Sequence, residues 1–122
     1  MKRAFVLFAA ATLAAGCSTA PQPRVPLPSG AYAFEHRYAE QPQHPGMSLE
    51  VTIRGRHIVV FNPVASGPFP AGVLAEGRLW WHAASGQWIV AYAREDRTAE
   101  DVGGCSDGPE VVDLERKIYW TC

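Results

Sequence analysis

The sequence predicts a small all-β domain, an antiparallel meander of about seven short strands that forms either a barrel or an open half-barrel. Three observations lead to this fold class. Apolar residues recur at every second position in several short segments, and no segment keeps a period of 3.6 residues over three helical turns. Turn-forming residues separate these segments at short intervals. Residues 31–122 are enough for one small domain and not for two.

The expected strands follow one another along the domain at residues 31–38, 48–54, 57–62, 73–82, 87–93, 109–114 and 118–122. The second of these strands alternates most clearly, because Leu49, Val51 and Ile53 share one face and polar residues occupy the other. This is the pattern of a half-buried strand. Gly55 permits a tight turn into the third strand, so the two strands are expected to form a hairpin.

The connections between the strands are predicted from their turn residues. Residues 62–72 contain three prolines and two glycines, which indicates a long loop. Residues 83–86 join the fourth and fifth strands as a second hairpin, and residues 115–117 join the last two strands as a third. Residues 94–104 are acidic and end in paired glycines, so we expect a loop or at most one helical turn there.

The beginning of the chain is typical of an exported, lipid-modified protein. Lys2 and Arg3 precede an apolar run over residues 4–15, which is shorter than the roughly 20 residues that a membrane-spanning helix needs. The sequence LAAGC at residues 13–17 places small residues directly before a cysteine. It resembles the lipobox of bacterial lipoproteins, which implies cleavage before Cys17 and lipid attachment to its thiol. An ordinary cleaved signal followed by an unmodified cysteine is the alternative.

This resemblance implies where the protein is found and how its chain is divided. Ser18, rather than an aspartate, follows the cysteine, which implies a lipid-anchored protein of the cell envelope at the outer membrane, on its periplasmic or surface side. Residues 1–16 would then be the signal peptide. Residues 17–30 would be the lipidated cysteine and a proline-rich tether, and 31–122 the β domain. Extended residues at about 3.1 Å each would let this tether hold the domain some 40 Å from the lipid.

The charge of the mature chain argues against a nucleic-acid partner. Removing residues 1–16 lowers the count of basic residues from 11 to 9 against 12 acidic ones, so the net charge becomes −3 with histidine neutral. The remaining basic residues are scattered singly or in pairs along the sequence. A nucleic-acid surface requires a clustered basic patch, so we expect none.

Two cysteines remain in the mature domain, and we expect them to form a disulfide. Cys105 and Cys122 are an even pair in an exported chain. Their bond would tie the glycine-rich loop to the last residue, with a stabilisation of about 3 kcal/mol. A redox-active or metal-binding pair is the alternative, although the CxxC spacing typical of such sites is missing.

The sequence predicts neither a cofactor nor a metal site, and it favours a protein that is not an enzyme. The four histidines, at positions 36, 44, 57 and 82, form no HExxH pattern, although strand pairing could bring His57 and His82 together. The acidic residues before Cys105 lack the DxDxDG spacing of a calcium loop. The chain contains no GxSxG elbow for a nucleophilic serine. A small enzyme whose groups converge only in the fold is the alternative.

Aromatic residues concentrate in the last two hairpins and supply the candidates for a binding surface. Alternation places Leu79 and Trp81 on one face of their strand and Trp80 and His82 on the other. Exposed aromatic side chains on a rigid sheet are favoured binding anchors. The alternative is that these aromatics fill the core of a small domain. The binding candidates are Trp80, His82, Ser85, Trp88 and Tyr119.

The turn ASGQW at residues 84–88 permits a sharper hypothesis. It is similar to the SGxxY loop of the membrane-bound inhibitors of c-type lysozyme, which are small β-barrel envelope lipoproteins with a disulfide. The resemblance covers about five residues, and this turn carries a tryptophan, Trp88, rather than the usual tyrosine. It implies that Ser85 enters the lysozyme cleft and forms hydrogen bonds with the catalytic carboxylates.

Together these features predict a lipid-anchored binding module of the cell envelope that recognises a protein partner through an aromatic sheet face. Three other functions remain open: an inhibitor of an envelope-degrading hydrolase such as lysozyme, a carrier of a small apolar ligand inside a barrel, and a small enzyme. Membrane contact is expected through the N-terminal lipid.

Overall fold

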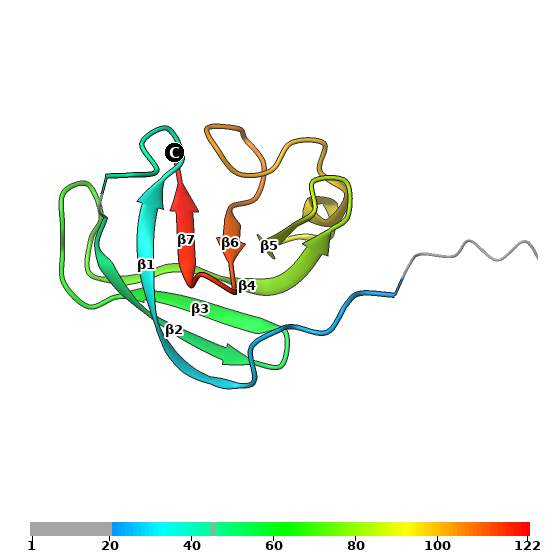
Figure 1. Ribbon diagram of the computed structural model, residues 1–122, viewed down its shortest axis with the longest axis horizontal. Coiled ribbons are helices and arrows are strands. Elements are labelled where there is room, and N and C mark those ends of the chain that lie inside the picture. Colours follow the sequence, from blue (N-terminus) through cyan, green and yellow to red (C-terminus); the bar gives the residue numbers. More distant parts are fainter. Residues whose placement is uncertain (1–20, 45) are drawn as a thin grey trace, which may run out of the picture.

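The computed structural model describes residues 21–44 and 46–122, and these form one seven-stranded sheet that closes on itself as a barrel (Figure 1). The strands are β1 (Gly30–Tyr38), β2 (Ser48–Arg54), β3 (His57–Asn62), β4 (Gly72–His82), β5 (Gln87–Ala91), β6 (Val111–Asp113) and β7 (Ile118–Thr121). The predicted all-β class and the number of strands are confirmed. The cleavage site, Cys17 and Ser18 lie outside the described residues.

The sheet closes through a parallel pair, whereas the sequence predicted antiparallel pairing alone. Each strand pairs antiparallel with its successor. Seven strands that alternate in direction leave the first and last pointing the same way, so β1 and β7 meet in parallel (Figure 1). Their register runs from Glu35 opposite Ile118 to Tyr38 opposite Thr121.

The interior of the barrel is a packed apolar core. Strand β2 alternates strictly between buried and exposed residues, as its sequence pattern predicted. The buried residues that share this core are Phe34, Leu49, Val51, Ile53, Ile58, Val60, Ala75, Leu79, Val90, Val112, Leu114 and Tyr119. Burial of one large apolar side chain stabilises a fold by about 1.5–3 kcal/mol. This core therefore accounts for the stability of so small a domain.

The proline-rich segment lies against the barrel from residue 21 to residue 30, rather than standing free as a tether. Val25 and Leu27 are partly buried against the core. The N–H of Gly55, in the turn between β2 and β3, donates to the Ser29 hydroxyl at 2.8 Å. Apolar residues between the prolines give the segment a surface to bury, so it packs along the barrel although residues 21–29 belong to no strand.

The long connection between β5 and β6 forms a second layer outside the sheet. It begins with a short 3-10 helix, η1 (Arg94–Thr98), within the stretch expected to form a loop or one helical turn. Below this connection the outward-facing side chains of Ile89, Val111 and Ile118 are buried. A Cβ added to Gly103 would lie 2.7 Å from the Val111 side chain, so the loop backbone packs closely on the strand.

The predicted disulfide between Cys105 and Cys122 is confirmed, with a Cα–Cα distance of 4.6 Å. Cys105 lies in the loop that covers β5–β7, and Cys122 directly follows β7. The disulfide therefore holds this outer layer to the strand that closes the barrel.

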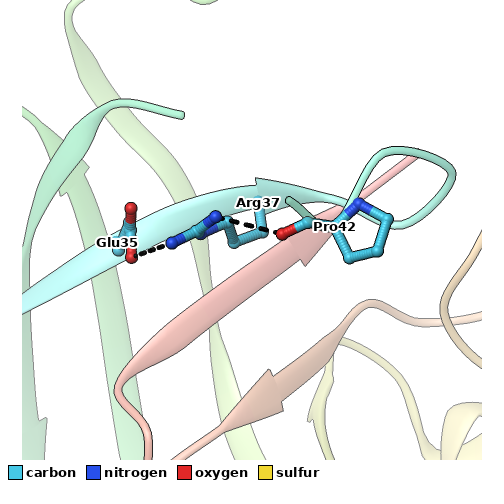
Figure 2. A network of polar contacts seen from close by, with 3 residues as sticks. All are labelled: Glu35, Arg37 and Pro42. Atoms are coloured by element: carbon cyan, nitrogen blue, oxygen red, sulfur yellow. Dashed lines mark hydrogen bonds and ion pairs between the residues drawn. The ribbon is translucent and has the colours of Figure 1, made fainter. Parts of the chain in front are cut away.

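Two polar clusters fix the loop that follows β1. Arg37 donates from one guanidinium nitrogen to the Glu35 carboxylate at 2.9 Å and from another to the Pro42 carbonyl at 3.0 Å (Figure 2). The neighbouring His36 points the other way, into the barrel, where its Nε2 lies 2.7 Å from the Thr121 hydroxyl. Burial lowers the pKa of His36 below its ordinary value of 6.5. The ring is therefore held in its neutral form.

The described residues contain no helix that is both long and apolar enough to cross a membrane.

Candidate functional site

A hollow of about 250 Å³ opens in the wall of the barrel beside β5 and β6. These strands pair at Trp88–Val112 and Ile89–Val111, and β6 has only three residues. The hollow extends past one end of this pairing, to residues that precede Trp88 and residues that follow Val112, and we call it the tryptophan groove. Its lining residues are Trp81, Gly86, Gln87, Trp88, Val111, Val112, Asp113, Leu114, Glu115 and Trp120.

Two of the three tryptophans form one wall of the groove. Trp81 on β4 and Trp88 on β5 are cross-strand partners, and their ring centroids lie 5.5 Å apart at an interplanar angle of 64°. The guanidinium of Arg56 lies 6.0 Å from the Trp88 ring centroid. Edge-to-face aromatic pairs and cation–π contacts each stabilise such an arrangement by about 0.5–1.5 kcal/mol. The two rings are therefore held in place rather than free to fold into the groove.

The N-terminal segment holds the same wall from outside the sheet. The Gln22 side-chain amide donates to the Trp81 carbonyl at 3.1 Å and accepts from the Trp81 N–H at 2.7 Å. The Gln22 side chain thus makes the two hydrogen bonds with the Trp81 backbone that the backbone of a neighbouring strand would otherwise make. Arg56 also donates to the Pro23 carbonyl. Residues 22 and 23 are thus attached to both tryptophans of the wall.

Carboxylates give the groove a negative side. The Asp113 carboxylate accepts hydrogen bonds from the backbone N–H groups of Glu115 and Arg116 at 3.1 and 2.8 Å. These bonds fix the turn that follows β6. Glu115 is exposed, and the lining contains no basic residue. A lining that combines aromatic rings with two acidic residues suits a group that is both apolar and positively charged.

The predicted candidates His82 and Ser85 belong to the structure of the turn between β4 and β5. His82 Nε2 lies 2.6 Å from the Ala99 carbonyl, which can only accept, so Nε2 carries the proton. Nδ1 then accepts from the Ser85 hydroxyl at 2.7 Å and from the Ser85 N–H at 3.2 Å. Gly86, with a φ of 67°, closes the turn by donating to the His82 carbonyl. The Ser85 hydroxyl is therefore engaged within its own hairpin.

The remaining candidates are separated from the groove, apart from Trp88. Trp80 lies on the outer face of β4, where the Arg97 guanidinium stacks 4.5 Å from its ring centroid. Tyr119 lies in the core and is only 2% exposed, so it is not available as a surface anchor. Burial, together with the nearby charge of Glu110, raises its pKa. The five candidates therefore do not form one aromatic face.

Trp81 and Trp120 were not among the binding candidates predicted from the sequence. Alternation placed Trp81 on the face of Leu79, and the hairpin register places it directly opposite Trp88. That register follows from a four-residue turn at 83–86 and was the signal available. Trp120 lines the groove from β7, and the sequence did not indicate this.

Within residues 21–44 and 46–122, the arrangement of possible metal ligands adds no site. His57 contacts Glu76 at 3.0 Å, while His82 contacts Ser85 and Ala99, so strand pairing does not bring the two histidines together. Ligand-type atoms of Glu40, Cys105 and Cys122 lie within 4.8 Å of one another, but the two sulfurs are bonded to each other.

Comparison of the chain with models of protein families, with curated proteins and with solved structures gave no match.

Proposed function

We propose that this protein is a lipid-anchored binding module of the bacterial cell envelope that recognises a protein partner at the tryptophan groove. The observation that carries the proposal is the groove itself, which the paired rings of Trp81 and Trp88 line together with Asp113 and Glu115. The lipobox-like sequence before Cys17 supports the anchor. The disulfide supports an oxidising compartment, since such bonds persist outside the reducing cytosol.

The size and chemistry of the groove indicate the kind of partner. A volume of about 250 Å³ is below that of most sites for drug-sized ligands, which begin near 300 Å³. It suits one or two side chains of a larger surface, as in the central pockets of protein interfaces. Aromatic walls and a carboxylate rim favour a partner segment that inserts an apolar residue beside an arginine or lysine.

The other three functions receive less support from the same residues. A serine that enters a lysozyme cleft needs a free hydroxyl, whereas that of Ser85 is 2.7 Å from His82 Nδ1. A carrier needs an interior cavity, whereas the described core is filled with side chains. The His82–Ser85 pair resembles a base beside a nucleophile, but both groups close a turn. Assays of lysozyme inhibition with the mature protein test the first of these alternatives directly.

The proposal is tested by co-purification from solubilised bacterial envelopes. Glu115→Lys reverses an exposed rim charge without disturbing the core, and Glu50→Lys makes the same change on the exposed face of β2. We expect Glu115→Lys to weaken partner capture about tenfold, the change produced by 1.4 kcal/mol, and Glu50→Lys to retain it. Trp88→Ala should also lose the partner.

Two results would contradict the proposal. Equal capture by the wild type, Glu115→Lys and Trp88→Ala would mean that the groove is not the binding surface. Mass spectrometry of the mature protein tests the anchor separately, because lipidation adds the mass of acyl chains to Cys17. An unmodified Cys17 would exclude the anchored form whatever the groove binds.

A further inference from the structure

A second surface lies where the described chain emerges from the barrel. Pro21 is the first described residue, and Gln22 is hydrogen-bonded to the backbone of β4. Four residue steps separate Cys17 from Pro21, so the chain can span at most about 14 Å between them. If Cys17 carries the lipid of the proposed function, on which this inference rests, the barrel surface around Pro21 is held close to the membrane.

That surface is formed by a wide, shallow hollow of about 670 Å³. Its lining residues are Pro21, Gln22, Trp80, Arg94, Glu95, Arg97 and Thr98, and we call it the arginine–tryptophan face. Arg97 stacks over the Trp80 ring at 4.5 Å, so the apolar ring and the cation form one unit. Arg94, at the start of η1, is exposed beside it.

The fold gathers positive charge here that the sequence scatters. A neighbouring hollow along the N-terminal segment is lined by residues 24–29, Gly55 and Arg56, which places Arg24 and Arg56 beside the same segment. The two hollows together contain four arginines and a single carboxylate, Glu95. The mature chain nevertheless has three more acidic than basic residues. The positive charge is therefore concentrated on the side of the barrel where Pro21 and Gln22 lie, closest in sequence to the proposed anchor at Cys17.

We propose that the arginine–tryptophan face rests on the bilayer and that its arginines contact the phosphates of anionic phospholipid headgroups. Guanidinium groups match phosphate geometry with paired donors, and they are less strongly hydrated than ammonium groups. Tryptophan is enriched at the level of the headgroups because its ring is apolar and its N–H is polar. Basic groups are attracted to an anionic surface over about one Debye length, roughly 8–10 Å, and the short connection to Cys17 allows the face to approach the bilayer to within this distance.

The test uses the lipidated full-length mature protein in vesicles of phosphatidylcholine and phosphatidylglycerol with brominated acyl chains, which quench nearby tryptophan fluorescence. We expect quenching in the wild type and loss of most of it in Trp80→Phe. Trp120→Phe is the matched control, because Trp120 lies on β7, three strands away from β4 in the closed barrel. It should retain the quenching.

Charge variants keep the test independent of any effect of Trp80→Phe on folding. Arg94→Glu should reduce the quenching, and raised salt should reduce it in the wild type, because exposed charges are screened. Arg116→Glu, which changes an exposed arginine outside both hollows, should leave the quenching unchanged. Equal effects of the two charge reversals, or equal quenching of the wild type and Trp80→Phe, would overturn the proposed contact.

Mass spectrometry of the same sample separates this inference from the proposed function. A lipidated protein that shows no quenching overturns the membrane-facing surface alone and leaves the anchored module intact. A protein without lipid on Cys17 overturns both.

Discussion

Removal of the Cys105–Cys122 disulfide should destabilise the domain by about 3 kcal/mol. The two cysteines are 17 residues apart, and the chain-entropy model assigns about 3 kcal/mol to closing a loop of this length in the unfolded state. The native contacts point the same way. Cys122 directly follows Thr121, the last residue of β7, and the parallel β1–β7 pair closes the barrel. The Thr121 carbonyl also accepts from the N–H of Ala39 at 2.7 Å.

The measurement is urea unfolding of the Cys105→Ser, Cys122→Ser double variant, followed by tryptophan fluorescence. For a domain of this size, 1 kcal/mol corresponds to about 4–8 °C in Tm, so thermal unfolding of the same variant should show a decrease of about 12–24 °C. Wild-type protein unfolded with and without reductant provides an independent comparison. A loss of stability below about 1 kcal/mol in both experiments would refute the reasoning, since the loop and β7 would then be held by other contacts.

Two further predictions concern single residues of the fold. Gly77→Ala should destabilise the domain by about 1–3 kcal/mol, because its new Cβ would lie 2.7 Å from the Ala91 carbonyl oxygen. Gly55→Ala should destabilise the domain by about 1 kcal/mol, because the new Cβ meets no atom within 4 Å but the residue has a φ of 60°. A lower urea midpoint for Gly55→Ala than for Gly77→Ala would contradict this packing. Stability should fall as the pH drops below about 6.5, because the unfolded chain then protonates His36 while the folded chain, with its lowered pKa, does not. The slope contributed by this residue is at most about 1.4 kcal/mol per pH unit, and urea titrations of His36→Gln at several pH values should show a flatter profile.

Local patterns in the sequence were sufficient for the strands and for the disulfide. Alternation over residues 48–54 predicted β2 within its observed bounds, and Gly55 predicted the turn that follows. Docking of residues 21–30 was not predicted, because it depends on Val25 and Leu27 meeting an apolar surface that only the folded barrel creates. Proline content indicates an extended backbone but does not determine whether that backbone is solvated or packed.

The candidate site was less predictable than the fold, because it depends on which face of each strand turns inward. Alternation correctly separated Trp80 from Trp81, and Tyr119 from Trp120. It did not determine that Tyr119 is the inward residue of β7. Nor did it determine that the connection between β5 and β6 reaches the end of β4, where Ala99 contacts His82 and removes it from the surface. Both outcomes follow from barrel closure and from the long connection between β5 and β6.

The attachment of residues 22 and 23 links the two proposed surfaces mechanically. Gln22 makes two hydrogen bonds with the backbone of Trp81, and Arg56 contacts both Pro23 and the Trp88 ring. The segment that would lead to the lipid is therefore bonded to the wall of the tryptophan groove. A free tether would let the groove take any orientation, whereas these contacts fix the groove relative to the point of anchoring. A partner can approach an anchored module held in this way only from a restricted direction. Gln22→Ala should therefore weaken partner binding to the membrane-anchored protein more than partner binding to the detergent-solubilised protein.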